Sequence, residues 1–123
     1  MSTDINLYRS TISDVNNALI ERHSLMKSLL QKNGGDPVGL ELKSKFTDSW
    51  VIVLSDASQE GCFRIQHYDN NGFSGHQTYS SALKALEEGI RQHFCLYDKG
   101  SLNRLSNSFA WDYDIQHVFS CST

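Results

Sequence analysis

The chain has 123 residues, of which 39% are hydrophobic and 20% are charged, and its formal net charge is −3 at pH 7. This length suits one hydrophobic core, so we predict a single domain over residues 1–123. The basic and acidic side chains are spread along the chain without a basic half, which argues against direct contact with nucleic acid. The chain has no run of about 18 apolar residues, so we expect no membrane-spanning segment.

The first ten residues and the cysteines indicate a cytoplasmic protein. The stretch MSTDINLYRS lacks the charged and then apolar pattern of a secretion signal. The chain holds three cysteines, an odd number, and no C-x-x-C pair. This cysteine usage argues against a disulfide framework.

Residues 5–31 are predicted to form an amphipathic helix within an N-terminal helical segment of residues 1–33. Apolar side chains recur there at spacings of three, four or seven, which places them on one face. They are Tyr8, Ile12, Val15, Leu19, Met26 and Leu29. Glycines and a proline in residues 34–37 end the helix, and poor helix formers leave open a later start at Ser13. The apolar seam either packs on its own sheet or pairs with a second copy, so we expect a monomer or a homodimer.

Residues 38–123 are predicted to form a core of sheet and helix. Alternating apolar residues, or a continuous β-branched run, predict strands in four stretches. These stretches are residues 38–46, 50–54, 62–68 and 73–79. We expect three or four of them to form an antiparallel meander, with residues 50–54 as the central strand.

A second helix follows the meander. Ser80 or Ser81 is predicted to cap it. Its apolar stripe consists of Leu83, Leu86, Ile90 and Phe94. A short helical turn is expected over residues 101–105.

A last strand is predicted over residues 109–119, which completes an α+β fold. Aromatic and other large side chains occupy alternate positions there, as in a strand with one buried face. The opposite face carries Asp112 and Asp114, whose charges would discourage pairing at a sheet edge.

The residues Asp69 to Gly72 are predicted to form the turn of a β-hairpin. They fit a type I turn followed by a glycine bulge, in which the aspartate carboxylate accepts backbone N–H bonds. This register places Asp69 opposite Phe73, and it puts Phe73 on the same face as Ile65.

His67 and His76 flank this turn, which raises the question of a shared metal or proton. In the predicted register His67 lies opposite Gly75, so the two histidines point to opposite faces of the hairpin. We therefore predict no site shared between them.

Other candidate chemistry is weak at the sequence level. His93-x-Cys95 and His117-x₃-Cys121 could supply zinc ligands, but H-x-C is an unusual spacing for such a site. The chain contains no glycine-rich nucleotide loop and no nucleophile elbow. We therefore expect a non-enzymatic protein that needs no cofactor. The alternative is a small enzyme that uses a histidine or cysteine in a pocket.

Residues 62–111 carry a resemblance to a known kind of domain. The relevant features are the F-R-I-Q strand, the D-x-x-G-F-S-G-H turn, the alanine-leucine helix and the G-S-L-N-R-L segment. They resemble a small domain of accessory proteins from plasmids and phages, including domains attached to large polyvalent proteins. Such proteins often disarm host defences, such as restriction or CRISPR systems, by binding a protein component.

The resemblance implies a small inhibitor of the anti-CRISPR or anti-restriction type, with a host protein or protein complex as its partner. Two surfaces are suited to such a partner. The hairpin tip, Asp69 to Phe73, offers an aromatic side chain that could anchor an interface. The acidic face, with Asp112 and Asp114, offers carboxylates that could attract a basic protein. The candidate partner-binding residues are Asp69, Asn70, Asn71, Phe73, His76, Asp112 and Asp114. A self-associating regulatory protein built on the N-terminal helix is a further alternative.

Overall fold

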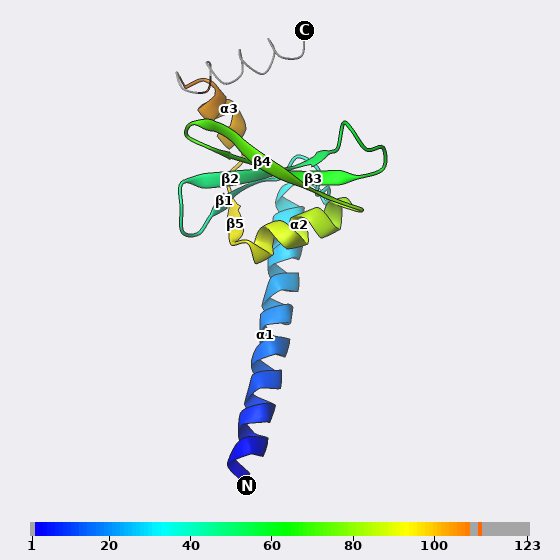
Figure 1. Cartoon of the computed structure of the whole chain (residues 1–123), viewed down its shortest axis with the longest axis vertical. Coiled ribbons are helices and arrows are strands. Elements are labelled where there is room, and N and C mark those ends of the chain that lie inside the picture. The colour runs from blue at the N-terminus through cyan, green and yellow to red at the C-terminus, as the bar shows by residue number, and fades with distance from the viewer. Residues whose placement is uncertain (1, 109–110, 112–123) are drawn as a thin grey trace.

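The computed structural model describes the backbone of residues 2–108 and 111, and the side chains from residue 13 onward within that range. It has an α+β fold, which confirms the predicted class (Figure 1). The elements are α1 (Ser2–Lys32), β1 (Glu41–Ser44), β2 (Ser49–Ser55), β3 (Phe63–Asp69), β4 (Gly72–Tyr79), α2 (Ala82–Arg91), β5 (Phe94–Tyr97) and α3 (Ser101–Ser106). The continuous α1 excludes the later helix start at Ser13.

Five strands form one antiparallel sheet in the order β4-β3-β2-β1-β5. The four predicted strands are present, and β5 is an addition. Phe94 was expected on the stripe of the second helix, but it begins β5 and pairs with Ser44 of β1. The helix ends earlier because His93 takes a left-handed φ of +73°, which turns the chain back toward the sheet.

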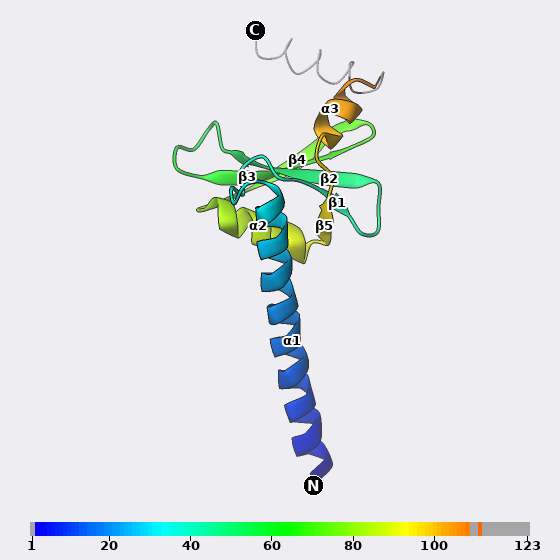
Figure 2. The ribbon, with the colours of Figure 1, turned by 180° about the vertical axis from the view of Figure 1, so that it is seen from behind.

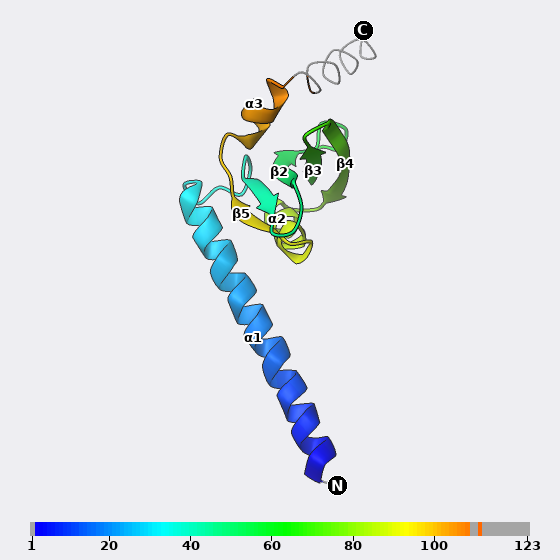
Figure 3. The same cartoon turned by 90° about the vertical axis from the view of Figure 1, so that its left-hand side faces the viewer.

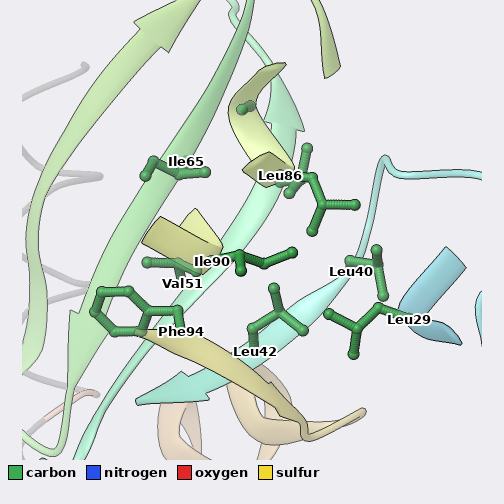
Figure 4. Close-up of a cluster of buried hydrophobic side chains, with 10 residues drawn as sticks. Leu29, Leu40, Leu42, Val51, Ile65, Leu86, Ile90 and Phe94 are labelled. Atoms are coloured by element: carbon green, nitrogen blue, oxygen red, sulfur yellow. The ribbon is translucent and has the colours of Figure 1, made fainter. Parts of the chain in front are cut away.

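One face of the sheet, the inner face, is covered by α2 and by the C-terminal end of α1 (Figures 3 and 4). Ser81 caps α2, since its hydroxyl accepts a hydrogen bond from the backbone N–H of Lys84 at 3.1 Å. The core under these helices is almost wholly aliphatic. Its buried members are Leu29, Leu40, Leu42, Val51, Val53, Ile65, Ala85, Leu86, Ile90 and Phe94.

The opposite, outer face is covered in part by α3 and by Trp111. Trp50, Ile52, Tyr68 and Trp111 form a second buried cluster, against which Leu102 and Leu105 of α3 pack. Hydrogen bonds hold this cover in place. The Tyr68 hydroxyl lies 2.7 Å from the Ser101 hydroxyl, and the Trp111 indole N–H donates to the carbonyl of Asp69 at 2.6 Å.

The segment predicted as a C-terminal strand is helical at the one position that the structure describes, Trp111. Its backbone N–H donates to the hydroxyl of Ser108 at 3.4 Å. The alternation of aromatic residues was therefore a misleading signal at this position. The remaining residues of the segment lie outside the described ones.

The long α1 extends away from the sheet, and its C-terminal end alone reaches the inner face (Figures 1 and 2). Four side chains near that end contact the inner core: Leu25, Met26, Leu29 and Leu30. None of the described helices, α1 included, combines the length and the apolar character that crossing a bilayer requires.

Candidate partner-binding surface

The β3–β4 hairpin differs from its predicted register near the turn. Asp69 lies opposite Gly72 and not opposite Phe73. The register shifts between His67 and Tyr68, so Tyr68 pairs with Phe73 and leaves Ser74 as the extra residue. One part of the predicted turn chemistry is confirmed, because the Asp69 carboxylate accepts the backbone N–H of Asn71 at 2.8 Å. The predicted glycine bulge is wrong, because Gly72 pairs with Asp69 at the start of β4 and the extra residue is Ser74.

The bulge moves Phe73 to the outer face, whereas the sequence placed it on the inner face with Ile65. The Phe73 ring meets the Trp111 indole edge to face, with 4.8 Å between the ring centroids. Even so, 42% of Phe73 remains exposed. The outer cluster therefore ends at an aromatic side chain that is only partly covered.

The two histidines of the hairpin lie on opposite faces, as predicted. His67 pairs with Gly75 and contacts the ring of Phe94 on the inner face, with 5.4 Å between centroids. His76 pairs with Gln66, on the outer face. The geometry gives no site shared by the two imidazoles.

Part of the outer face is left uncovered by α3. We define the outer-face patch as Leu54, Arg64, Gln66, Phe73 and His76, which come from β2, β3 and β4. The first four line a hollow of about 270 Å³. Two residues of the patch, Phe73 and His76, were predicted as partner-binding candidates.

A buried carboxylate, that of Asp56, borders the patch and is fully engaged. It accepts hydrogen bonds from the Ser58 hydroxyl at 2.7 Å, the Thr78 hydroxyl at 2.7 Å and the Ser58 backbone N–H at 2.9 Å. These bonds, with a smaller contribution from the positive charge of Arg64, hold the pKa of Asp56 well below its usual 3.8. The carboxylate is therefore charged at neutral pH.

Arg64 lies in the floor of the hollow and is incompletely bonded. Among the described residues, no atom accepts a hydrogen bond from its buried Nε–H. A buried donor without an acceptor costs about 1–3 kcal/mol. The hollow thus combines an apolar wall, a partly exposed aromatic ring and the cationic side chain of Arg64.

The patch borders a sheet edge, because β4 is the outermost strand. Residues 73–77 of β4 are all exposed, and the strand contains no charged residue and no proline. Natural edge strands usually carry such residues to prevent pairing with other chains. The bulge at Ser74 interrupts this edge but leaves His76 to Tyr79 in regular pairing with β3.

The remaining predicted candidates are less closely connected with the patch. Asn70 and Asn71 are exposed at the turn, and the carboxylate of Asp69 is engaged within the turn itself. Asp112 and Asp114 lie outside the described residues. Sequence reasoning missed Leu54, Arg64 and Gln66 as members of one surface, because they come together only through the pairing of β2 with β3.

The described residues include two free thiols and no cluster of metal ligands. Cys62 and Cys95 are free and half-buried. Within residues 13–108 and at 111, no group of three or more His, Cys, Asp or Glu side chains could hold a metal ion. The second half of the zinc pattern, His117 and Cys121, lies outside the described part of the chain.

No protein-family model, curated protein or solved structure matches this chain. The resemblance of residues 62–111 to accessory domains of mobile elements therefore stays an expectation.

Proposed function

We propose that the protein is a non-enzymatic binding protein that captures a protein partner on the outer-face patch. The observation that carries this proposal is the uncovered hollow, which is lined by partly exposed Phe73 and by Arg64. Aromatic and arginine side chains are the residues that most often dominate the energy of protein interfaces.

The chemistry of the patch defines the partner. An apolar or aromatic side chain would fill the hollow between Leu54 and Phe73, and a carboxylate would meet the positive charge of Arg64. An extended segment could also pair with the uncharged edge of β4, which offers backbone groups in addition to side chains.

The biological context of the proposal comes from the resemblance. Small accessory proteins of mobile elements often bind a component of a host defence complex. We therefore propose an inhibitor of that type, with a restriction or CRISPR complex as the first partner to test. The proposal of a defence inhibitor is narrower than the proposal of protein binding at the patch. The first proposal would be wrong, and the second still right, if the patch bound a protein unrelated to defence.

The experiment is affinity capture from bacterial lysates that contain candidate defence complexes, at moderate salt, with partners identified by mass spectrometry. Phe73→Ala and Arg64→Gln should each remove a stoichiometric partner that the unchanged protein captures. Leu83→Ala is the matched control, since Leu83 is a half-exposed apolar residue on α2, on the inner side of the sheet.

Unfolding must be measured on each variant, so that loss of binding is separated from loss of fold. A partner that survives both patch substitutions would overturn the proposed site. Capture of no partner from any of the lysates would overturn the inhibitor proposal.

A further inference from the structure

The apolar seam of α1 is used by its own domain at one end only. Leu29 is buried in the inner core, and Met26 is partly buried against it. Toward the N-terminus the same seam is open, because Val15 is 54% and Leu19 is 42% exposed. The expectation that the seam packs on its own sheet is therefore met at the C-terminal end of the helix alone.

The whole seam, from its open part at Val15 and Leu19 to its buried end at Leu29, follows a heptad spacing. Val15, Leu19, Arg22, Met26 and Leu29 are separated by four, three, four and three residues. In the sequence the same spacing continues back to Ile12 and Tyr8. An average spacing of 3.5 residues is the pattern of a helix that packs along a second helix.

A single helix in this position lacks the packing that would stabilise it. Isolated helices gain little from propensity alone, and most helical stability in proteins comes from packing of the apolar face. The side chains of residues 13–21 are exposed, and they include the additional apolar residue Ile20. A partner that covers Val15 and Leu19 would supply the missing contacts.

A hollow continues the open seam toward the domain. It measures about 560 Å³ and lies along the C-terminal part of α1 and the turn that follows. Its lining includes His23, Met26, Leu30 and Gly34. The hollow shares Met26 alone with the seam. The exposed apolar surface of the helix is therefore the part of the seam at Val15 and Leu19.

We infer that this surface binds α1 of a second copy of the chain, in a two-stranded coiled coil. Charged residues beside a heptad seam normally select a different partner helix. Here the flanking positions in the described part include no Asp, Glu, Lys or Arg: they are Asn16, Ala18, His23 and Leu25. Nothing at these positions repels an identical helix, and each copy supplies the same apolar seam.

Arg22 is the one charged residue on the described seam, and it lowers the affinity of the two helices for each other. Its position lies between Leu19 and Met26, where a coiled coil buries apolar side chains. A polar residue at such a position lowers stability in exchange for specificity. The dimer is therefore expected to dissociate on dilution.

The first test is the molar mass of the intact chain by light scattering. At about 50 µM, where a micromolar complex is mostly formed, we expect twice the chain mass of 13.9 kDa. The double variant Val15→Asp/Leu19→Asp should raise the dissociation constant about 100-fold or more, because both substitutions place charge in the buried seam. Asn17→Asp adds charge on the opposite side of the helix and should leave the dimer unchanged.

Two further measurements keep the test decisive. Near-UV circular dichroism from the tryptophans should be the same in all variants, since Val15 and Leu19 lie away from both cores. Arg22→Leu should tighten the dimer by about tenfold, since it completes the apolar seam.

A monomer at this concentration, or a dimer that survives the double substitution, would overturn the inference. Capture at the outer-face patch is a separate readout: Phe73→Ala should leave the dimer intact, and the double variant should still bind at the patch.

Discussion

The inner and outer faces of the sheet are built on different principles. The inner core is filled mainly by aliphatic side chains from α1, α2 and three strands, with Phe94 of β5 beside them (Figure 4). The outer face has a small aromatic cluster whose cover, α3 and Trp111, is held by specific hydrogen bonds.

This difference shows where a small domain can place a binding surface. Continuous aliphatic packing leaves no space, whereas a partial cover leaves a hollow at its border. The outer-face patch lies at this border, where its own Phe73 contacts Trp111 of the cover. If the comparison is right, substitutions on the inner face should lower stability, and substitutions in the patch should affect binding.

The largest effect on stability is expected inside the inner core. Leu86→Ala should lower the free energy of unfolding by about 2–4 kcal/mol, because Leu86 is fully buried and its removal leaves a cavity. Leu83→Ala on the same helix should change it by less than about 0.5 kcal/mol, since Leu83 is half-exposed. Urea unfolding of both variants measures the difference, and equal losses would contradict the assignment of the inner face.

On the outer face, one carboxylate accepts three hydrogen bonds from the start of the cover. Glu41 of β1 accepts hydrogen bonds from the backbone N–H groups of Gly100 and Leu102, at 3.0 and 2.7 Å, and from the Ser101 hydroxyl at 3.1 Å. It acts as the N-cap that α3 lacks in its own sequence.

Glu41→Ala should therefore lower the free energy of unfolding by about 1–2 kcal/mol, and it should also loosen α3. Urea unfolding and tryptophan fluorescence report these two changes. Glu60→Ala, at an exposed loop position, is the control. Unchanged stability of Glu41→Ala would show that apolar contacts alone hold the cover.

The sequence predicted the inner face far better than the outer one. A continuous apolar run over residues 50–54 marked β2, alternation along residues 62–68 marked β3, and the serine before α2 marked its cap. These signals are local. The inner face also needs only apolar side chains of suitable size, so most of its members could be named from the pattern.

The outer face depends on contacts between distant parts of the chain, which no local pattern encodes. Gly72 and Gly75 both permit irregular backbone, and the register that forms places Phe73 against Trp111. β5 was missed for a similar reason: Phe94 fits a helical stripe, but its partner Ser44 lies 50 residues earlier.

Acid should lower the free energy of unfolding, in part because Asp56 on the outer side of the sheet becomes protonated. Its folded-state pKa is depressed by the hydrogen bonds from Ser58 and Thr78. The stabilisation is therefore complete above the usual value near 3.8 and is lost as pH falls below it, because the unfolded state takes up the proton first. Urea midpoints from pH 6 to pH 2.5 should fall more steeply for the unchanged protein than for Asp56→Asn. Parallel curves would contradict this role of Asp56.

The smallest effect should be a gain in stability on the inner face. Gly89 lies within α2, and an added Cβ would meet side-chain methyl groups of Val51 and Ile65 at 3.7 and 3.9 Å, which is ordinary contact. Gly89→Ala should raise the free energy of unfolding by about 1 kcal/mol, since alanine has the higher helix propensity. A loss of stability in urea would show that the inner core has no room for a methyl group.

The central claim is that the outer-face patch binds a protein partner and the inner side does not. It is tested most directly with a photo-crosslinking amino acid placed at position 76 in the patch or at position 83 on α2, in bacterial cells that carry the candidate defence complexes. We predict one discrete crosslinked protein from position 76 and none from position 83. The same products from both positions, or a product from position 83 alone, would contradict the account.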